Sequence, residues 1–219
     1  MQKIYNFDSK FDYVGDFKSE WSQEIVKNEP MLFNCNLESA YKLGGPITKA
    51  FLDSIQNLEG WENIVVDSRV HMLMKGWFPA IPGYHHDDVP RDSDGQPDYD
   101  RPTYKSEHIM GLVNGSICPT VFAVGKHTLP KIYKPEIVYK KWHTIVEDQI
   151  ESGVLNTVEV ESGKLIYFNT ESIHTAQRAK SSGWRWFIRV SKNTERTKNC
   201  TNELRRQVQV YLEFPMEGW

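Results

Sequence analysis

The sequence predicts a mainly β protein with flanking helices (α+β), built around a β-barrel or jelly roll. From residue 64 onward, the chain consists of short runs rich in β-branched and aromatic residues, separated by Gly, Pro, Asn and Asp. Three other segments have the spacing of amphipathic helices. The chain has 219 residues, of which 39% are hydrophobic, and this is enough for one well-buried domain. We therefore expect helices packed on a β-sandwich.

The chain reads as one domain, residues 1–219, in three parts. Residues 1–63 are predicted to form a helical N-terminal support, residues 64–192 the β-barrel core, and residues 193–219 a C-terminal extension. No internal repeat or low-complexity linker separates these parts, so nothing in the sequence indicates a second domain.

The three predicted helices span residues 17–28, 46–60 and 135–152. Each places its apolar residues at helical spacing on one face. The second helix begins with Pro46 in its first turn and closes near Gly60, as helix termini commonly do.

The predicted strands alternate with turn residues along the rest of the chain. They lie in residues 63–77, 108–116, 119–127, 156–161, 164–169, 184–191 and 207–214. The longest connection, residues 90–106, is polar and has no apolar periodicity. A loop of this length in a compact domain is commonly functional, and we predict a mobile lid.

Composition excludes several classes of protein. No apolar stretch approaches the roughly 18–20 residues that cross a bilayer, and the N-terminus lacks the pattern of a signal peptide. The net charge of −3 excludes a generally basic nucleic-acid binder. Cys35, Cys118 and Cys200 are widely spaced and odd in number, so we expect thiols in a reducing cytosol, a cytoplasmic location and no membrane partner.

The charges are unevenly distributed, and they point to two different substrates. Residues 178–206 carry nine Lys or Arg against two Glu, which leaves 17 against 27 elsewhere and a balance of −10. The basic stretch favours a phosphate-bearing substrate, including a nucleotide or nucleic acid. An acidic segment favours a cationic substrate instead, such as an amino acid or a basic side chain. Its residues are Asp87, Asp88, Asp92, Asp94, Asp98 and Asp100.

Two overlapping His-x-Asp pairs follow the first predicted strand of the barrel, in the segment PGYHHDDVPR. One pair is His85 and Asp87, and the other is His86 and Asp88. Residues i and i+2 of a strand point to the same face, so either pair offers an imidazole and a carboxylate to one metal ion.

A later histidine and an alternating strand complete the pattern. His174 follows the apolar run KLIYFN, and the strand WRWFIRVS places Arg185 and Arg189 on the face opposite its tryptophans. Two imidazoles and one carboxylate on one face of Fe(II) leave three coordination sites open, which a 2-oxo acid and dioxygen can fill. A guanidinium on a neighbouring strand suits the far carboxylate of such a co-substrate.

Over roughly residues 64–192, the order of these motifs resembles that of the Fe(II)/2-oxoglutarate-dependent dioxygenases. The resemblance implies a cupin-like double-stranded β-helix that uses Fe(II), 2-oxoglutarate and dioxygen. It also implies metal binding by His85, Asp87 and His174. We prefer this register because members of the family commonly place an aromatic residue before the first ligand, as Tyr84 is here.

The same resemblance implies how the co-substrate is held. Arg185 and Arg189 lie 11 and 15 positions after His174, both within the usual range of the family. Arg189 is the expected anchor for the distal carboxylate of 2-oxoglutarate, with Ser191 assisting. Arg185 is expected to meet the carboxylate end bound at the iron, or the substrate, and it is the alternative anchor.

Two other classes of protein compete with this interpretation. A cupin-like binding protein or isomerase would share the barrel and the metal, but it would not need an inward arginine on the last strand. A non-enzymatic β-sandwich interaction module would need neither. Within the enzyme class, the presence of Asp87 favours hydroxylation or oxidative demethylation over halogenation. The expected substrate is a small molecule, an amino acid or a nucleotide.

Overall fold

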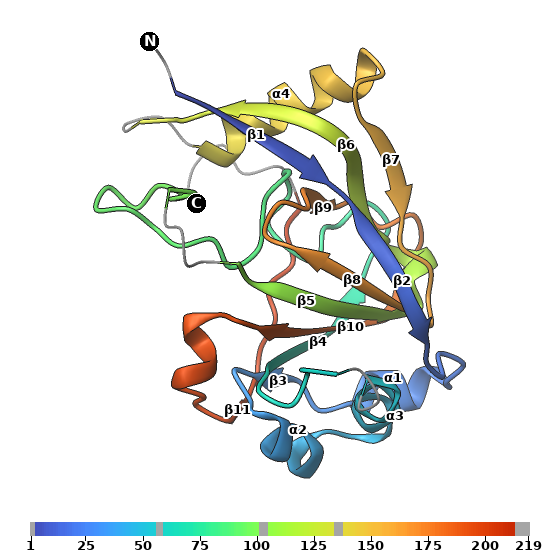
Figure 1. The fold of residues 1–219 in the computed structure, drawn as a ribbon. Helices are drawn as coiled ribbons and strands as arrows, with labels where there is room; N and C mark the ends of the chain where they lie inside the picture. The colour runs from blue at the N-terminus through green and yellow to red at the C-terminus, as the bar shows by residue number, and fades with distance from the viewer. Residues whose placement is uncertain (1–2, 56–58, 101–104, 134–137, 213–219) are drawn as a thin grey trace.

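The computed structural model describes residues 3–55, 59–100, 105–133 and 138–212. It confirms a mainly β protein with flanking helices (Figure 1). The strands are β1 (Ile4–Ser9), β2 (Phe11–Asp16), β3 (Leu32–Phe33), β4 (Val65–Leu73), β5 (Glu107–Val113), β6 (Thr120–Pro130), β7 (Asn156–Glu159), β8 (Lys164–Asn169), β9 (His174–Ala176), β10 (Gly183–Lys192) and β11 (Glu203–Leu204). The helices are α1 (Gln23–Asn28), α2 (Leu37–Leu43), α3 (Pro46–Ile55) and α4 (Val138–Glu151).

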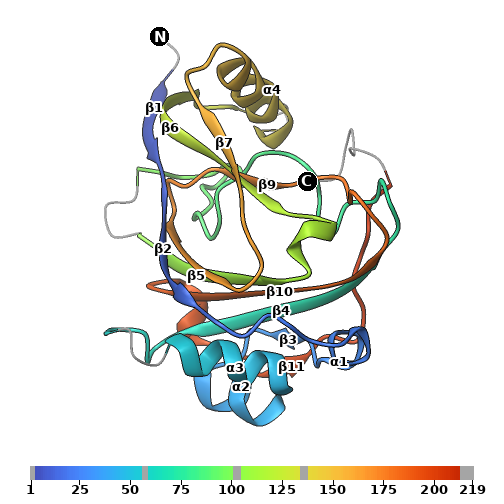
Figure 2. The ribbon, with the colours of Figure 1, turned by 90° about the vertical axis from the view of Figure 1, so that its right-hand side faces the viewer.

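Two antiparallel sheets form the body of the molecule (Figure 2). The larger has the order β2-β8-β5-β10-β4, and the smaller has the order β1-β6-β7 with β9 also paired to β6. From β4 onward the chain passes from the larger sheet to the smaller and back twice. This alternation between two sheets is the type of connection that a jelly roll uses.

Apolar side chains from both sheets meet between them. Met110 of β5, Phe122 of β6 and Phe168 of β8 belong to one buried cluster, and Phe122 and Phe168 have ring centroids 5.2 Å apart. These apolar side chains fill part of the space between the sheets, and Met110 and Phe168 also line a cavity beside them.

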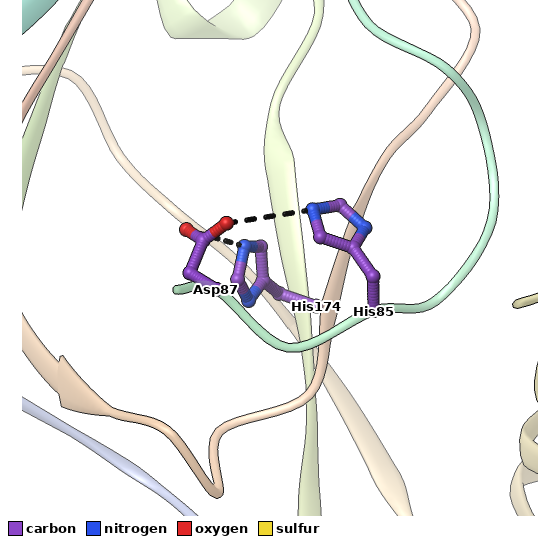
Figure 3. Close-up of side chains that lie close together, drawn as sticks. All are labelled: His85, Asp87 and His174. Carbon is purple, nitrogen blue, oxygen red and sulfur yellow. Dashed lines mark ion pairs between the residues drawn. The ribbon is translucent and has the colours of Figure 1, made fainter. Parts of the chain in front are cut away.

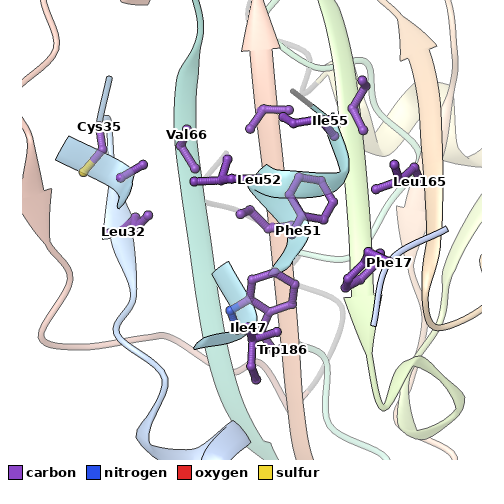
Figure 4. Packing of buried hydrophobic residues seen from close by; sticks show 14 of the residues in the cluster. Phe17, Leu32, Cys35, Ile47, Phe51, Leu52, Ile55, Val66, Leu165 and Trp186 are labelled. Carbon is purple, nitrogen blue, oxygen red and sulfur yellow. The ribbon is translucent and has the colours of Figure 1, made fainter. Parts of the chain in front are cut away.

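The outer face of β10 packs against the N-terminal helices, as its alternation predicts. Trp186, Ile188 and Val190 are fully buried in one cluster with Phe51 and Leu52 of α3 (Figure 4). Removing this apolar face from water stabilises the fold by about 1.5–3 kcal/mol per large side chain. The consequence for the site is geometric, because the other face of β10 must then point between the sheets.

Helix α4 covers the smaller sheet. Trp142 is 1% exposed, and its indole Nε1 donates a hydrogen bond of 2.9 Å to the carbonyl of Pro130 at the end of β6. The prediction of a helix within residues 135–152 is confirmed for 138–151, and its first three residues lie outside the described residues.

Several details of the sequence-based prediction were wrong. The first helix begins at Gln23 rather than residue 17, because the Ser22 side chain caps it by accepting a hydrogen bond from the N–H of Ile25 at 3.3 Å. Helix α2 was not predicted. Residues 1–63 are not only helical, since β1 and β2 add a strand to each of the two sheets.

The C-terminal extension was also predicted incorrectly. The described part of the expected strand 207–214 forms only one isolated bridge, in which Tyr211 and Phe78 exchange backbone hydrogen bonds of 2.8 and 2.9 Å. The segment is thus tied down at Tyr211 without joining a sheet. Among the described residues, no helix has the length and apolarity needed to cross a membrane.

The long polar loop 90–106 is described as far as residue 100, with residues 101–104 outside the description. Its first half has local order: the carboxylate of Asp92 accepts hydrogen bonds from the N–H groups of Asp94 and Gln96 at 3.0 and 2.9 Å. Arg91 donates to the hydroxyl of Tyr139 on α4 at 2.7 Å. Its role as a lid stays a prediction.

Candidate metal centre

His85 and His174 are brought together by an isolated β-bridge next to the smaller sheet. The N–H of each residue donates to the carbonyl of the other, at 3.0 and 3.1 Å. His174 also pairs with Phe122 of β6. The segment that carries His85 therefore lies beside β9, on the side away from β6, and pairs with it through this one residue.

Asp87 lies across from the two imidazoles (Figure 3). One carboxylate oxygen is 3.3 Å from Nε2 of His174, and the other is 3.9 Å from Nε2 of His85. One donor atom from each of the three residues lies within 4.8 Å of the others. Adjacent donors on an octahedral ion are about 3 Å apart for bonds of about 2.1 Å. A small contraction would thus let all three reach one ion.

The backbone holds both rings in the orientation that a metal needs. Nδ1 of His85 donates to the carbonyl of Gly83 at 2.9 Å, and Nδ1 of His174 donates to the carbonyl of Ser172 at 3.1 Å. A carbonyl oxygen only accepts, so each Nδ1 carries the proton, and a neutral ring then has its lone pair on Nε2. Metal-binding histidines are commonly oriented in this way.

Burial and charge favour the metal-binding protonation states. Burial lowers the pKa of His85 to about 4, so the ring is neutral at pH 7. Burial alone would raise the pKa of Asp87, but the charge of Arg189 beside it holds this pKa well below its ordinary value of 3.8. Two imidazoles and one carboxylate are the donor set of a facial triad, so the residues present fit Fe(II).

The alternative register is separated from this cluster. Nδ1 of His86 is hydrogen-bonded to the hydroxyl of Tyr99, and its ring packs 4.8 Å from that of Phe7. Asp88 has a left-handed backbone, with φ of 49°, and its carboxylate faces Arg196 at 3.5 Å. His85 and Asp87 converge on His174, whereas His86 and Asp88 point to two other places.

Arg189 lies beside the candidate metal ligands. Its guanidinium contacts the carboxylate of Asp87 and is 3.7 Å from that of Asp88. These carboxylates raise its pKa although burial opposes this. The residue therefore already has anionic partners, and it touches a carboxylate that we expect to bind the metal.

Arg185 lies on the same face of β10, four residues away and about 13 Å along the strand. It is 3% exposed, and it donates from Nε to the carbonyl of Cys118 at 2.6 Å and from Nη2 to the hydroxyl of Thr120 at 3.3 Å. Among the described residues, it has no carboxylate within 4 Å. A buried guanidinium without an anion is costly, so this site calls for an anionic ligand.

Ser191 is fully buried, and its hydroxyl is 2.8 Å from Nδ1 of His108. Nε2 of His108 is in turn 3.0 Å from the hydroxyl of Ser106. The Ser191 hydroxyl is therefore already engaged in a side-chain network, and it is absent from the residues that line the cavity.

A cavity of about 350 Å³ between the sheets contains the candidate ligands and both arginines of β10. Its wall includes a set of charged residues that the sequence-based prediction missed, namely Asp67, Arg69, Arg196 and Arg205. A signal was present for two of them. Asp67 and Arg69 alternate with apolar residues in VVDSRVHML, which places them on the inward face of β4 opposite Arg189 and Phe187.

Comparisons with known proteins give matches in structure only. No family model matches the chain, and no curated protein matches its sequence. The solved structures to which it is similar include HygX from Streptomyces hygroscopicus with iron bound, at 11% identity and a TM-score of 0.45, covering 84% of this chain and 82% of that one. HygX with nickel and 2-oxoglutarate bound gives 12% identity and a TM-score of 0.44, covering 84% and 81%. CytC3 with Fe(II) and alpha-ketoglutarate gives 10% and 0.37, covering 82% and 71%. Because these identities and scores are low, we derive the function from the side chains of the site.

Proposed function

We propose that this protein is a non-haem Fe(II)- and 2-oxoglutarate-dependent dioxygenase that hydroxylates, or oxidatively demethylates, a small molecule. One observation carries the proposal: a His-Asp-His cluster and the buried guanidinium of Arg185, which has no anionic partner among the described residues, line the same cavity. The first feature suits the metal, and the second suits the far end of a dicarboxylate.

His85, Asp87 and His174 would hold Fe(II) through two Nε2 atoms and one carboxylate oxygen. When bound there, Fe(II) supplies open coordination sites at which a 2-oxo acid and dioxygen react. The overall reaction is balanced by the co-substrate. It loses its carboxyl group as CO₂ and becomes succinate with one oxygen atom of O₂, while the other oxygen atom enters a C–H bond of the substrate as a hydroxyl.

Arg185 and Thr120 would hold the distal carboxylate of 2-oxoglutarate. This revises the expectation that Arg189 is the anchor. Charge supports Arg185, because it has no anion among the described residues. Position argues against Arg189: it contacts the candidate ligand Asp87, whereas the distal carboxylate of a co-substrate bound to the metal would lie farther from the ligands. Arg189 would instead lie beside the end of the co-substrate that is nearest the metal.

Within the cavity, the protein would hold the proximal groups in fixed protonation states. His85 stays neutral because of burial, and Asp87 stays ionised because of Arg189. Phe168 and Phe122 pack with ring centroids 5.2 and 5.1 Å from that of His174, which limits the access of water to this ligand. Excluding water from the site also strengthens the ion pair between Arg185 and a carboxylate.

A cupin-like metal-binding protein without oxygenase activity is the second candidate. It shares the metal ligands, so metal binding alone does not separate the two. The buried Arg185 favours the oxygenase, because a metal-binding protein without a dicarboxylate co-substrate has no use for a buried cation there.

The test is co-substrate consumption by the full chain loaded with Fe(II). We expect 2-oxoglutarate to be converted to succinate in the presence of dioxygen, slowly without a substrate and faster with one. An Asp87→Ala variant should not produce succinate, whereas His86→Ala, a matched change at the position between His85 and Asp87, should retain production. Metal-loaded protein that binds no 2-oxoglutarate in calorimetry, and produces no succinate, would favour the cupin-like alternative.

A further inference from the structure

The candidate active site carries more positive charge than the proposed reaction uses. Five arginines line the inner cavity, and three aspartates face them. The arginines are Arg69, Arg185, Arg189, Arg196 and Arg205, and the aspartates are Asp67, Asp87 and Asp88. In the proposed function, Asp87 binds the metal and Arg185 binds the co-substrate. The remaining arginines then outnumber the remaining aspartates by two.

The surplus is located at two residues. Arg196 pairs with Asp67 and, at 3.5 Å, with Asp88. Arg189 pairs with Asp87 and, at 3.7 Å, with Asp88. Arg69 has no hydrogen bond or carboxylate within 4 Å among the described residues. Burial and then the charges of Arg205 and Arg189 lower its pKa. Arg205 is 3.9 Å from Asp67, which is a long distance for an ion pair, and the carboxylate of Asp67 is already in contact with Arg196.

These two arginines stand where the inner cavity opens into a second one. The outer cavity has a volume of about 600 Å³. Five residues line both cavities, and they are Arg69, Pro79, Ala80, His85 and Arg205. The junction therefore combines two cations with little anionic compensation and one candidate metal ligand.

Among the described residues that line the outer cavity, no other one is charged. Beyond the junction it is lined by Ile81, Gln207, Val208, Gln209 and Tyr211. A polymer of phosphates would need cations along its path, and this cavity offers them only at the junction. One anionic group on an otherwise uncharged small molecule matches this distribution.

We infer that the primary substrate is a small molecule with one carboxylate or phosphate group, which Arg69 and Arg205 bind at the junction of the two cavities. This inference rests on the proposed function for the reaction itself. The uncharged remainder of the substrate lies in the outer cavity. The carbon next to the anionic group is then close to His85, within reach of the metal site.

The aspartates of the acidic loop do not oppose this assignment. Asp92, Asp94, Asp98 and Asp100 do not line either cavity, and Asp88 is engaged with Arg189 and Arg196. The sequence left an anionic and a cationic substrate open. The folded chain places four of the nine basic residues of 178–206 in the wall of the inner cavity, whereas most aspartates of the acidic segment line neither cavity.

The first experiment measures anion binding without turnover. Inorganic phosphate is titrated by calorimetry into the full metal-free chain at low salt, for the wild type and for Arg69→Gln, Arg205→Gln and Arg206→Gln. We expect phosphate affinity to fall by about tenfold or more in the first two variants. Arg206 is the matched control, because it neighbours Arg205 but lines neither cavity. Equal affinity in all four proteins, or no phosphate binding to the wild type, would overturn the inference.

The second experiment asks for the substrate class with loaded enzyme. Succinate release is measured with pairs of compounds that differ in one group, such as glucose 6-phosphate and glucose, or an N-acetyl amino acid and its amide. Stimulation confined to the anionic members, and reduced in Arg69→Lys, supports the inference. Stimulation by the neutral members, by cations, or only by an oligonucleotide overturns it while leaving the oxygenase intact. If Arg69→Gln weakens phosphate binding but the wild type never converts 2-oxoglutarate to succinate, the proposed function is rejected and the anion site is kept.

Discussion

His85 and His174 are 89 positions apart in the chain, yet each donates its backbone N–H to the carbonyl of the other. Their ring centroids lie 4.7 Å apart. The distance between the two candidate ligands is thus set by a β-bridge rather than by side-chain contacts alone. Paired backbone holds the two Cα atoms at a fixed separation, which preorganises the two side chains for one ion.

This pairing makes the register within HHDD testable. His85→Ala and His174→Ala should each lower Fe(II) or Mn(II) affinity by more than tenfold, because each removes one of three ligands. His86→Ala should change it less than threefold, since His86 faces Tyr99 and Phe7. Calorimetry of the four proteins measures this directly. Loss of binding in His86→Ala with retention in His85→Ala would move the site to His86 and Asp88.

A second prediction separates the two arginines of β10. Arg185→Lys keeps the charge but loses the planar fork, so the affinity for 2-oxoglutarate should fall by tenfold or more, equivalent to about 1.4 kcal/mol. Thr120→Val should weaken it in the same direction. The comparison is Arg189→Lys, for which we expect a smaller effect on binding. The reverse order, with Arg189→Lys the weaker binder, would restore Arg189 as the anchor.

A third prediction concerns Asp67, which holds the arginine cluster together. Its carboxylate is 10% exposed, contacts Arg196, and accepts from the N–H of Asn34 at 3.1 Å. Asp67→Asn leaves the partly buried Arg196 and Arg205 without this counter-charge and should lower the free energy of unfolding by about 2 kcal/mol. Asp16→Asn breaks the exposed pair with Lys164 and should cost less than about 1 kcal/mol. Urea denaturation that gives equal losses would show that Asp67 has no such role.

A fourth prediction follows from buried neutral histidines. Burial lowers the pKa of His71 to about 3 and that of His85 to about 4, and it lowers the pKa of His108 well below its ordinary value. The unfolded chain therefore binds more protons below pH 6.5, and the free energy of unfolding should fall as the pH drops from about 6.5 to 4. The slope is about 1.4 kcal/mol per pH unit for each histidine that stays neutral.

Urea denaturation of the metal-free protein between pH 7.5 and 4.5 measures this slope. His71→Gln should reduce it by the contribution of one proton. Stability that is constant down to pH 4.5 would mean that these histidines are protonated in the folded state as well. The aspartates with lowered pKa, Asp67 and Asp87, lose their contribution only below about pH 4, so the two groups act in different ranges.

A fifth prediction tests the packing of α3 on the larger sheet. A Cβ at Gly111 of β5 would lie 2.6 Å from Phe51 and 2.7 Å from Phe17. Gly111→Ala should therefore lower the free energy of unfolding by about 1–3 kcal/mol, because the rings must move in a packed core. A combined Gly111→Ala, Phe51→Leu protein should recover part of the loss if the contact is the cause. No recovery would assign the loss to the backbone of β5.

The sequence by itself predicted the class of fold and the segments that carry the candidate metal ligands. Both depend on local periodicity: alternation in WRWFIRVS predicts which face of β10 is apolar, and the His-x-Asp spacing puts two donors on one side of the chain. Such patterns are complete within a few residues. The helix start at Gln23 was missed for a related reason. The apolar spacing continues on the N-terminal side of Ser22, but the helix begins only after this N-cap residue.

Tertiary structure alone decided the remaining questions. Whether His85 or His86 meets His174 depends on a bridge between segments 89 positions apart. Which arginine of β10 lacks a carboxylate partner depends on the positions of Asp87 and Asp88, which both lie beside Arg189. Our inference of an anionic rather than a cationic substrate likewise depends on where the folded chain places the basic and acidic residues. Charge acts over distance in space, so only the folded chain shows which cations share a cavity and which carboxylates already neutralise them.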